Sequence, residues 1–123
     1  VSNEACAAHL LSADIHLVSQ QPEWMGVVVP SKFQAACALS RPVVFAGPAE
    51  SAVGTWIQES DAGWMLPPGE QTVVDSILHG ILDPEVRSKK GAAACRLFEQ
   101  RFKREANCAR VIEQIERIAK ERK

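Results

Sequence analysis

Residues 26–32 carry the clearest chemical signal in the sequence, because an apolar run ends at Pro30, Ser31 and Lys32 and a helix of small residues is predicted to follow. Proline is tolerated in the first turn of a helix, where its missing N–H has no partner, and a serine hydroxyl can cap a free N–H there. Lys32 adds a positive charge beside the positive end of the helix dipole, which is unfavourable unless an anion lies nearby. We therefore interpret this stretch, with Gly26 as a flexible approach, as a phosphate-binding helix N-terminus. The alternative is a solvated lysine in an ordinary turn.

Four other residues follow the two strands that we predict on either side of this helix. Glu23 and Trp24 come after the first strand, and Gly47 and Ser51 come after the second. Ligands of open α/β sheets bind at the carboxyl ends of the strands, so these residues are candidates for a ligand pocket. Trp24 fits equally well as a packed anchor of its loop, and Ser51 as the cap of the next helix. His16 interrupts the first strand, and we interpret it as a strand-end histidine in preference to a catalytic base.

The candidate residues lie between strands and helices that alternate along the chain. Strands are expected at residues 14–19, 42–46 and 63–66, and helices at residues 2–12, 30–39, 52–60, 70–82, 83–102 and 104–120. The strand at residues 42–46 is apolar without alternation, which is typical of a strand covered on both faces. Such alternation of strands and helices predicts a parallel sheet with helices on both faces. The first helix is expected to turn Ala5, Ala8, His9 and Leu11 toward the core.

A set of motifs in a fixed order runs through this pattern. Its parts are Ala13-Asp14-Ile15-His16-Leu17-Val18-Ser19, Pro22-Glu23-Trp24, Val29-Pro30-Ser31-Lys32-Phe33, Arg41-Pro42-Val43-Val44-Phe45-Ala46-Gly47-Pro48, Ser51, Asp61-Ala62-Gly63-Trp64, Pro67-Pro68-Gly69 and Leu97-Phe98-Glu99-Gln100-Arg101-Phe102. The set resembles the donor-binding C-terminal domain of family-4 glycosyltransferases, which belong to the GT-B class. The resemblance covers nearly the whole chain but only the last third or so of a family member. It implies an α/β fold with a Rossmann-like parallel sheet and flanking helices, of which residues 1–123 form a single partial domain.

The resemblance implies transfer of a sugar from a nucleotide-sugar donor to an acceptor, by a retaining enzyme that uses neither a metal ion nor a cofactor. Helix dipoles, backbone N–H groups and a cation then stabilise the diphosphate leaving group. The acceptor-binding N-terminal domain would belong to a longer parent, so this chain alone is expected to be inactive. No catalytic residue is assigned. The implied donor-phosphate residues are Gly26, Pro30, Ser31 and Lys32, and the implied residues of the donor sugar or nucleotide pocket are Glu23, Trp24, Gly47 and Ser51.

The chain departs from the family at one motif. Many members carry Glu-x7-Glu, whose second carboxylate holds the ribose hydroxyls, and the corresponding positions here are Val27 and Ala35. A subgroup with a Val-Pro-Ser-Lys pattern has a small residue at the second position, as this chain does. The absence of the acidic pair leaves a second interpretation open, which is a non-catalytic α/β interaction or regulatory module derived from a GT-B domain.

Composition argues against several other classes of protein. The net charge of −1 gives no general attraction for nucleic acid or for an anionic membrane. No apolar run approaches the roughly 20 residues that span a bilayer, and the first residues do not resemble a signal peptide. The four cysteines are widely spaced, without metal-ligand spacing to histidine, so we expect them to be reduced, with Cys37, Cys95 and Cys108 buried on helices. The expected location is the cytoplasm, with peripheral membrane attachment of the full-length enzyme as an option.

Two surfaces are expected to need partners. Missing strands would leave a free sheet edge and uncovered apolar faces, so the fragment is expected to self-associate or to pack on another chain or domain. The last helix carries Val111, Ile112, Ile115 and Ile118 on one stripe. In GT-B enzymes the terminal helix commonly crosses to the other domain, and the stripe is a candidate for that contact. Otherwise, the charged residues of this helix are typical of a helix face exposed to solvent.

Overall fold

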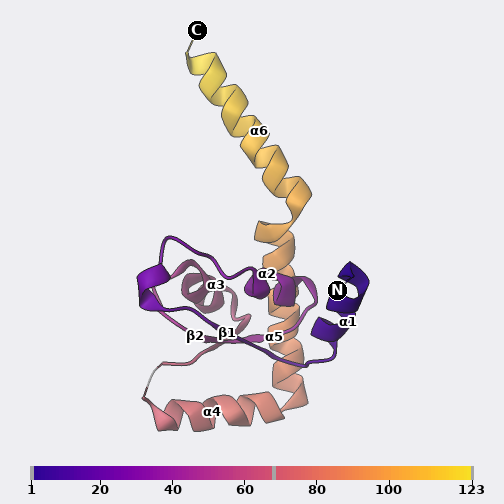
Figure 1. The fold of residues 1–123 in the computed structure, drawn as a ribbon, viewed down its shortest axis with the longest axis vertical. Helices are drawn as coiled ribbons and strands as arrows, with labels where there is room; N and C mark the ends of the chain where they lie inside the picture. Colours follow the sequence, from indigo (N-terminus) through magenta and orange to yellow (C-terminus); the bar gives the residue numbers. More distant parts are fainter. Residues whose placement is uncertain (1, 68, 123) are drawn as a thin grey trace.

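Three short strands alternate with helices along the chain (Figure 1). The structure is a computed structural model that describes residues 2–67 and 69–122. The strands are β1 (His16–Ser19), β2 (Val43–Ala46) and β3 (Gly63–Met65). The α-helices are α1 (Asn3–Leu11), α2 (Ser31–Ala38), α3 (Ala52–Ser60), α4 (Gln71–Leu82), α5 (Pro84–Leu97) and α6 (Arg104–Glu121), with a 3-10 turn at Pro22–Trp24 and a π-helical turn at Phe98–Phe102. The predicted order of elements is confirmed, and Pro68 of the Pro-Pro-Gly motif lies outside the described residues.

The three strands form one parallel sheet, as predicted, and their order in the sheet is β1-β2-β3. The N–H of His16 donates to Pro42 O at 3.1 Å, and the N–H of Gln20 donates to Ala46 O at 3.0 Å. Alternate residues of a strand point their backbone groups to opposite sides, so Leu17 directs its N–H and C=O away from β2. In the part of the chain that the structure describes, β1 is therefore a free edge.

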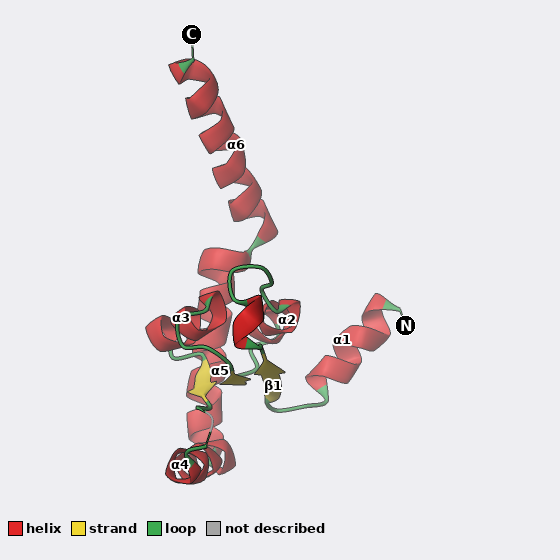
Figure 2. Cartoon of the chain, turned by 60° about the vertical axis from the view of Figure 1, so that its left-hand side comes forward, coloured by secondary structure: helices red, strands yellow, loops and turns green. Residues whose placement is uncertain are grey.

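Helices lie on both faces of the sheet, but they cover the two faces unequally (Figure 2). Helices α2 and α3 pack on one face, where Val43 and Phe45 are fully buried. Helix α4 lies on the other side, with Gly80 against the indole of Trp64. On this second face the side chain of Leu17 in β1 is 70% exposed. The predicted layers are present, and the second face is open near β1.

An aromatic cluster joins α2 to α3 and to the π-helical turn that follows α5. Phe33 is fully buried and stacks on Trp56 with ring centroids 6.0 Å apart. The ring of Phe102 meets Phe33 and Trp56 edge-on, at 6.1 and 4.7 Å. Aromatic pairs with these geometries are more favourable than their buried area alone. Because Phe33 lies in the first turn of α2, the cluster fixes the start of that helix over the sheet.

Helix α5 crosses the amino ends of the strands. Gly91 faces the carbonyl oxygen of Ser40, where any Cβ atom would clash with the backbone, so this close approach requires glycine. Lys90 Nζ donates to Gly63 O at 3.0 Å and lies 2.6 Å from Asp61 Oδ1. Packing of α5 thus covers part of the amino ends of the strands and leaves the carboxyl ends open.

The sheet and the helices packed on it form the body of the protein. Helices α1 and α6 stand away from this body in both ribbon views (Figures 1 and 2). The prediction that α1 turns Ala5, Ala8, His9 and Leu11 toward the core is wrong, because all four side chains are exposed. Helical spacing shows which residues share a face, but it does not show whether another element covers that face. The end of α1 is tied to the body by a hydrogen bond from Arg41 Nη2 to Leu11 O at 3.0 Å.

The four cysteines are free, as predicted, but they differ in exposure. Cys37 on α2 is fully buried, and this burial raises the pKa of its thiol to about 12. Cys95 is half-buried, and Cys6 and Cys108 are exposed. The prediction that Cys108 is buried is wrong because no other described element packs over it on α6, whereas α2 lies between the sheet and its neighbouring helices.

Cys37 should therefore react with an alkylating reagent only when the protein unfolds. The thiolate is the nucleophile, so a shielded thiol with a raised pKa stays protonated and unreactive near neutral pH, whereas exposed Cys6 is accessible. Peptide mapping by mass spectrometry after brief iodoacetamide treatment should find Cys6 modified, and Cys37 modified only after denaturant is added. Equal modification of both thiols in the folded protein would contradict the burial of Cys37.

Candidate functional site

Two neighbouring hollows open at the carboxyl ends of the strands. The larger has a volume of about 820 Å³ and the smaller a volume of about 350 Å³. Ser19, the last residue of β1, lines both of them. Ligands of parallel α/β sheets bind at this edge, so the two hollows together form the candidate site.

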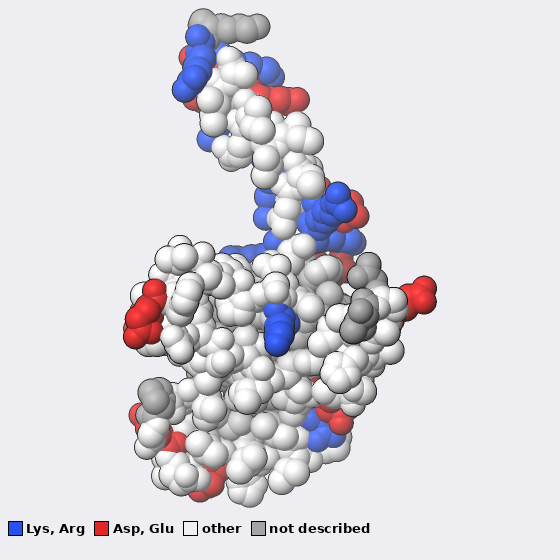
Figure 3. All heavy atoms as spheres, in the orientation of Figure 1, with Lys and Arg blue, Asp and Glu red and all other residues white. Residues whose placement is uncertain are grey.

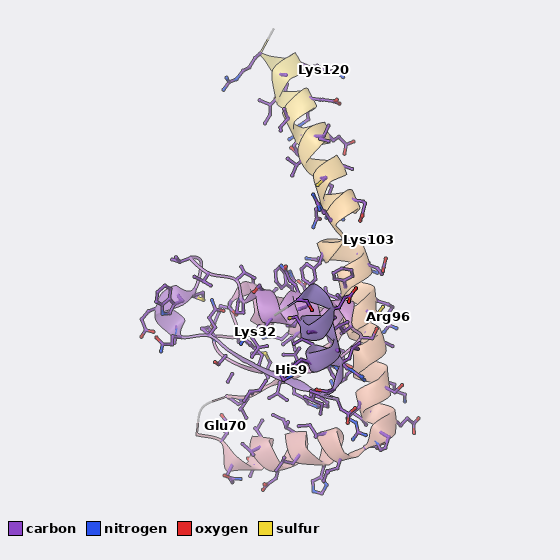
Figure 4. All side chains as sticks on the ribbon, turned by 45° about the vertical axis from the view of Figure 1, so that its right-hand side comes forward. His9, Lys32, Glu70, Arg96, Lys103 and Lys120 are labelled. Carbon is purple, nitrogen blue, oxygen red and sulfur yellow. The ribbon has the colours of Figure 1, made fainter. Side chains whose placement is uncertain are left out.

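The smaller hollow lies between β1 and the N-terminus of α2. Pro30, Ser31 and Lys32 line it, together with apolar residues of β1 and of the preceding loop. Lys32 is the one charged residue among the described residues that line it, and its side chain is exposed (labelled in Figure 4). The hollow thus carries a positive charge without a neighbouring carboxylate in its lining. Three of the four predicted donor-phosphate residues meet here.

The prediction that Ser31 caps α2 is wrong. Pro30 occupies the cap position with φ −62° and ψ 112°, no side chain caps the helix, and Ser31 is its first residue. A proline ring offers no oxygen to the N–H groups of the first turn. Within the described chain, the backbone N–H groups of Ser31 and Lys32 and the Ser31 hydroxyl therefore remain available to an anion.

Gln20 holds the loop that leads into α2, a role that the sequence analysis missed. Its Nε2 donates to Val28 O at 2.7 Å and to Trp24 O at 3.3 Å. Gly26, in the same loop, has φ +82°, a left-handed conformation that favours glycine. Gly26 lines neither hollow, so it shapes the loop while Gln20 ties the loop to the end of β1. A glutamine directly after a predicted strand was the only signal of this role in the sequence.

The larger hollow lies between the ends of the strands and α4, and its surface is mostly apolar. Gly47 lines it, and a Cβ atom at this position would come within 2.6 Å of the Phe45 ring and 3.0 Å of the Gln20 carbonyl oxygen. The only charged residue among the described residues in its lining is Glu50. The apolar surface comes from Met25, Leu66, Pro67 and Val74. An apolar hollow with a few polar groups suits a ring system better than a free anion.

The other three predicted pocket residues do not line either hollow. Glu23 and Trp24 are exposed on the 3-10 turn, and Trp24 Nε1 donates to Gln21 Oε1 at 3.3 Å. Ser51 is 2% exposed; its hydroxyl donates to Pro48 O at 2.7 Å and accepts from the N–H of Gly54 at 3.1 Å. The Ser51 hydroxyl therefore caps α3, which was the alternative that the sequence left open.

Other side chains that could take part in chemistry lie away from these hollows. His16 is at the start of β1, at the opposite end of the strand, where a strand-end histidine is expected. Among the described residues, no group of three or more His, Cys, Asp or Glu side chains lies close enough to hold a metal ion. The arrangement thus brings together a helix N-terminus, an ammonium group and an apolar hollow.

A third hollow of about 790 Å³ lies at the amino ends of the strands, beside α5. The carboxylates in its lining already have cationic partners. Asp14 Oδ1 lies 4.0 Å from Arg41 Nη1, and Glu99 Oε2 lies 2.8 Å from Lys103 Nζ. The hydrogen bond to Glu99 and its charge raise the pKa of Lys103. The remaining charged residues of this lining are Arg87 and Arg96. Its mixed, partly paired charges make it a weaker candidate, and it lies away from the carboxyl ends of the strands, where ligands of such sheets bind.

No family model, no curated protein and no solved structure matches the chain. None of the helices in residues 2–67 and 69–122 combines the length and the apolar character needed to cross a membrane. The function is therefore inferred from the geometry of the two hollows.

Proposed function

We propose that the chain is the donor-binding part of a retaining, metal-independent glycosyltransferase of the GT-B class. Its Rossmann-like domain would be completed in a longer protein. The observation that carries this proposal is the N-terminus of α2, where Lys32 and uncapped N–H groups lie beside an apolar hollow at the carboxyl edge of a parallel sheet. An anion joined to a ring system would fill both hollows at once. A nucleotide sugar has this chemistry.

In such a transfer, the bond between the sugar and the diphosphate breaks, and negative charge develops on the leaving diphosphate. The N-terminus of α2, the Ser31 hydroxyl and the Lys32 ammonium would stabilise that charge from fixed positions. Gln20 keeps the loop before α2 attached to β1, which holds these groups in place. The smaller hollow would then take the phosphates, and the larger hollow would take the sugar or the base.

The free edge of β1 supports a partial domain. Leu17 on this strand is 70% exposed, and Val28, which lines the same hollow as Leu17, is 44% exposed. Large apolar side chains exposed together beside an unpaired strand favour coverage by further strands. Under this proposal those strands and the acceptor-binding domain belong to the longer protein, and the chain alone binds donor weakly without catalysing transfer.

Nucleoside diphosphates should bind this chain at the start of α2. In a titration followed by amide NMR signals, uridine, guanosine, adenosine and thymidine diphosphates should shift the signals of Ser31 and Lys32, with a dissociation constant of about 1 mM for the preferred base. The matching nucleosides without phosphate should leave these two signals in place. If no diphosphate shifts them at concentrations up to about 10 mM, the proposed function is wrong.

A second candidate, a non-catalytic interaction module derived from the same fold, is favoured by one observation. The face of the body in Figure 3 is largely uncharged, and the exposed apolar residues Leu17 and Val27 suit a contact with another protein. This candidate requires no anion at Lys32. It therefore predicts that all four diphosphates leave the signals of Ser31 and Lys32 unchanged.

A further inference from the structure

Helix α6 is an amphipathic helix without a partner in the described chain. It extends from the body over 18 residues (Figures 1 and 2). All of residues 108–122 are exposed. Four aliphatic side chains share one stripe and are exposed by 57% (Val111), 57% (Ile112), 61% (Ile115) and 48% (Ile118). Most of the stability of a helix in a protein comes from packing of its amphipathic face, so burial of the stripe would stabilise α6.

The spacing of the stripe is that of a coiled-coil seam. Cys108, Val111, Ile115 and Ile118 follow one another at intervals of three, four and three residues, which are the a and d positions of a heptad. Ile112 flanks the seam and widens it on one side. With Ile112 at an e position, the apolar stripe is roughly 100° wide, wider than a strict a and d seam, so a partner must also cover this flank.

The charged residues of α6 lie outside this seam. Glu113 precedes Arg117 by four residues, and Glu116 precedes Lys120 by four, which is the favourable order for pairs along an exposed helix face. Acidic and basic residues are mixed along the helix, so the surface does not have the excess of positive charge that draws a helix to an anionic membrane. The pattern favours another amphipathic helix as the partner.

We propose that α6 pairs in antiparallel orientation with α6 of a second copy of this chain. In the register that aligns the two seams, Val111 of one copy lies against Ile115 of the other, and Cys108 lies against Ile118. The Ile112 side chains of the two copies then meet at the two-fold axis on one flank, and the Gln114 side chains meet on the other. The stripe is thus complementary to itself without any gap in the seam.

The shape of the protein favours the antiparallel orientation, and the charges of α6 permit it. At the flanks of the seam, Glu105 faces Ala119 of the second copy and Glu121 faces Asn107, so no two like charges oppose one another there. Each globular body is attached at the Arg104 end of its helix (Figure 1). Antiparallel pairing places the two bodies at opposite ends, whereas parallel pairing would crowd them side by side.

The expected dimer is weak and reversible. An 18-residue helix is about 27 Å long, so the overlap of two such helices is short. The pair would bury on the order of 1,000 Å² in total, at the lower limit of specific interfaces. A dissociation constant in the micromolar range is expected, with monomers at low concentration.

Sedimentation velocity over a range of concentrations tests the pairing. The wild-type chain should convert from monomer to dimer between about 1 and 300 μM. Ile115→Asp should remain monomeric over this range, because it places a carboxylate in the seam. Ala109→Asp adds the same carboxylate to α6 outside the seam and should dimerise like wild type. A monomeric wild type at the highest concentration, or an Ile115→Asp variant that dimerises as tightly as wild type, would overturn the proposal.

Disulfide formation tests the orientation. In the antiparallel register an Ile118→Cys side chain faces Cys108 of the second copy, within reach of a disulfide. Two Cys108 residues would be separated by about ten residues of helix, or roughly 15 Å, which is too far. With Cys6 replaced by serine in every sample, mild oxidation should link the Ile118→Cys variant through Cys108 and position 118 and leave the background protein unlinked. A Cys108–Cys108 link in the background protein would show parallel pairing and refute the antiparallel register.

Discussion

Phe33→Ala should lower the free energy of unfolding by about 3–5 kcal/mol. Phe33 is fully buried, and its ring contacts both Trp56 and Phe102 in the aromatic cluster. Alanine would remove the apolar area of the ring and leave a cavity between α2, α3 and the π-helical turn after α5, where a sheet on one side limits collapse. Domains of this size are stable by only about 5–15 kcal/mol, so the variant would lie close to its unfolding threshold.

Urea unfolding followed by circular dichroism would measure this loss, and Leu17→Ala is the matched control. Leu17 is an apolar side chain of the sheet that is 70% exposed, so its truncation should change stability by less than about 0.5 kcal/mol. The comparison separates the removal of buried volume from the removal of apolar surface. Similar losses for both variants would contradict the packing of the aromatic cluster.

The order of strands and helices was predictable because each rests on local periodicity. The non-alternating apolar strand at residues 42–46 required cover on both faces, and it became the central strand β2. Ser51 was predicted as a pocket residue with a helix cap as the alternative, and the cap is the role that it has. The parallel arrangement followed from the alternation of strands with helices, since parallel neighbours need a crossover between them.

What sequence reasoning missed depends on contacts between distant residues. The predicted core residues of α1 and the apolar stripe of α6 have helical spacing, yet all of these side chains are exposed because no other described element packs over them. The aromatic cluster joins residues 33, 56 and 102, which have no spacing in common. Ser31 and Ser51 lie in similar places in the sequence, each at the start of a helix. Ser51 takes the cap position of α3, whereas Pro30 takes the cap position of α2 and Ser31 becomes its first residue. The side-chain tie from Gln20 to Val28 likewise appears only when the chain is folded.

Lys32→Ala should weaken nucleoside-diphosphate binding by about tenfold to a hundredfold. An ammonium group beside a helix N-terminus is unfavourable by a few tenths to about 1 kcal/mol unless an anion offsets it. A hydrogen-bonded contact between this ammonium and a phosphate should contribute roughly 1.5–3 kcal/mol, which corresponds to the stated loss of affinity. The midpoint of thermal unfolding should move little, because the exposed Lys32 side chain supports no part of the core.

The amide NMR titration with the preferred diphosphate would measure this loss, with Lys89→Ala as the matched control. Lys89 is an exposed lysine on α5, at the amino ends of the strands, so its removal changes net charge by the same amount without touching either hollow. If Lys89→Ala weakens binding as much as Lys32→Ala, the attraction is general and not local to α2. If Lys32→Ala binds as tightly as wild type, the phosphate lies elsewhere, and if it fails to fold, Lys32 is structural. Selective loss of affinity in a folded Lys32→Ala variant would leave the start of α2 as the site that holds the phosphate.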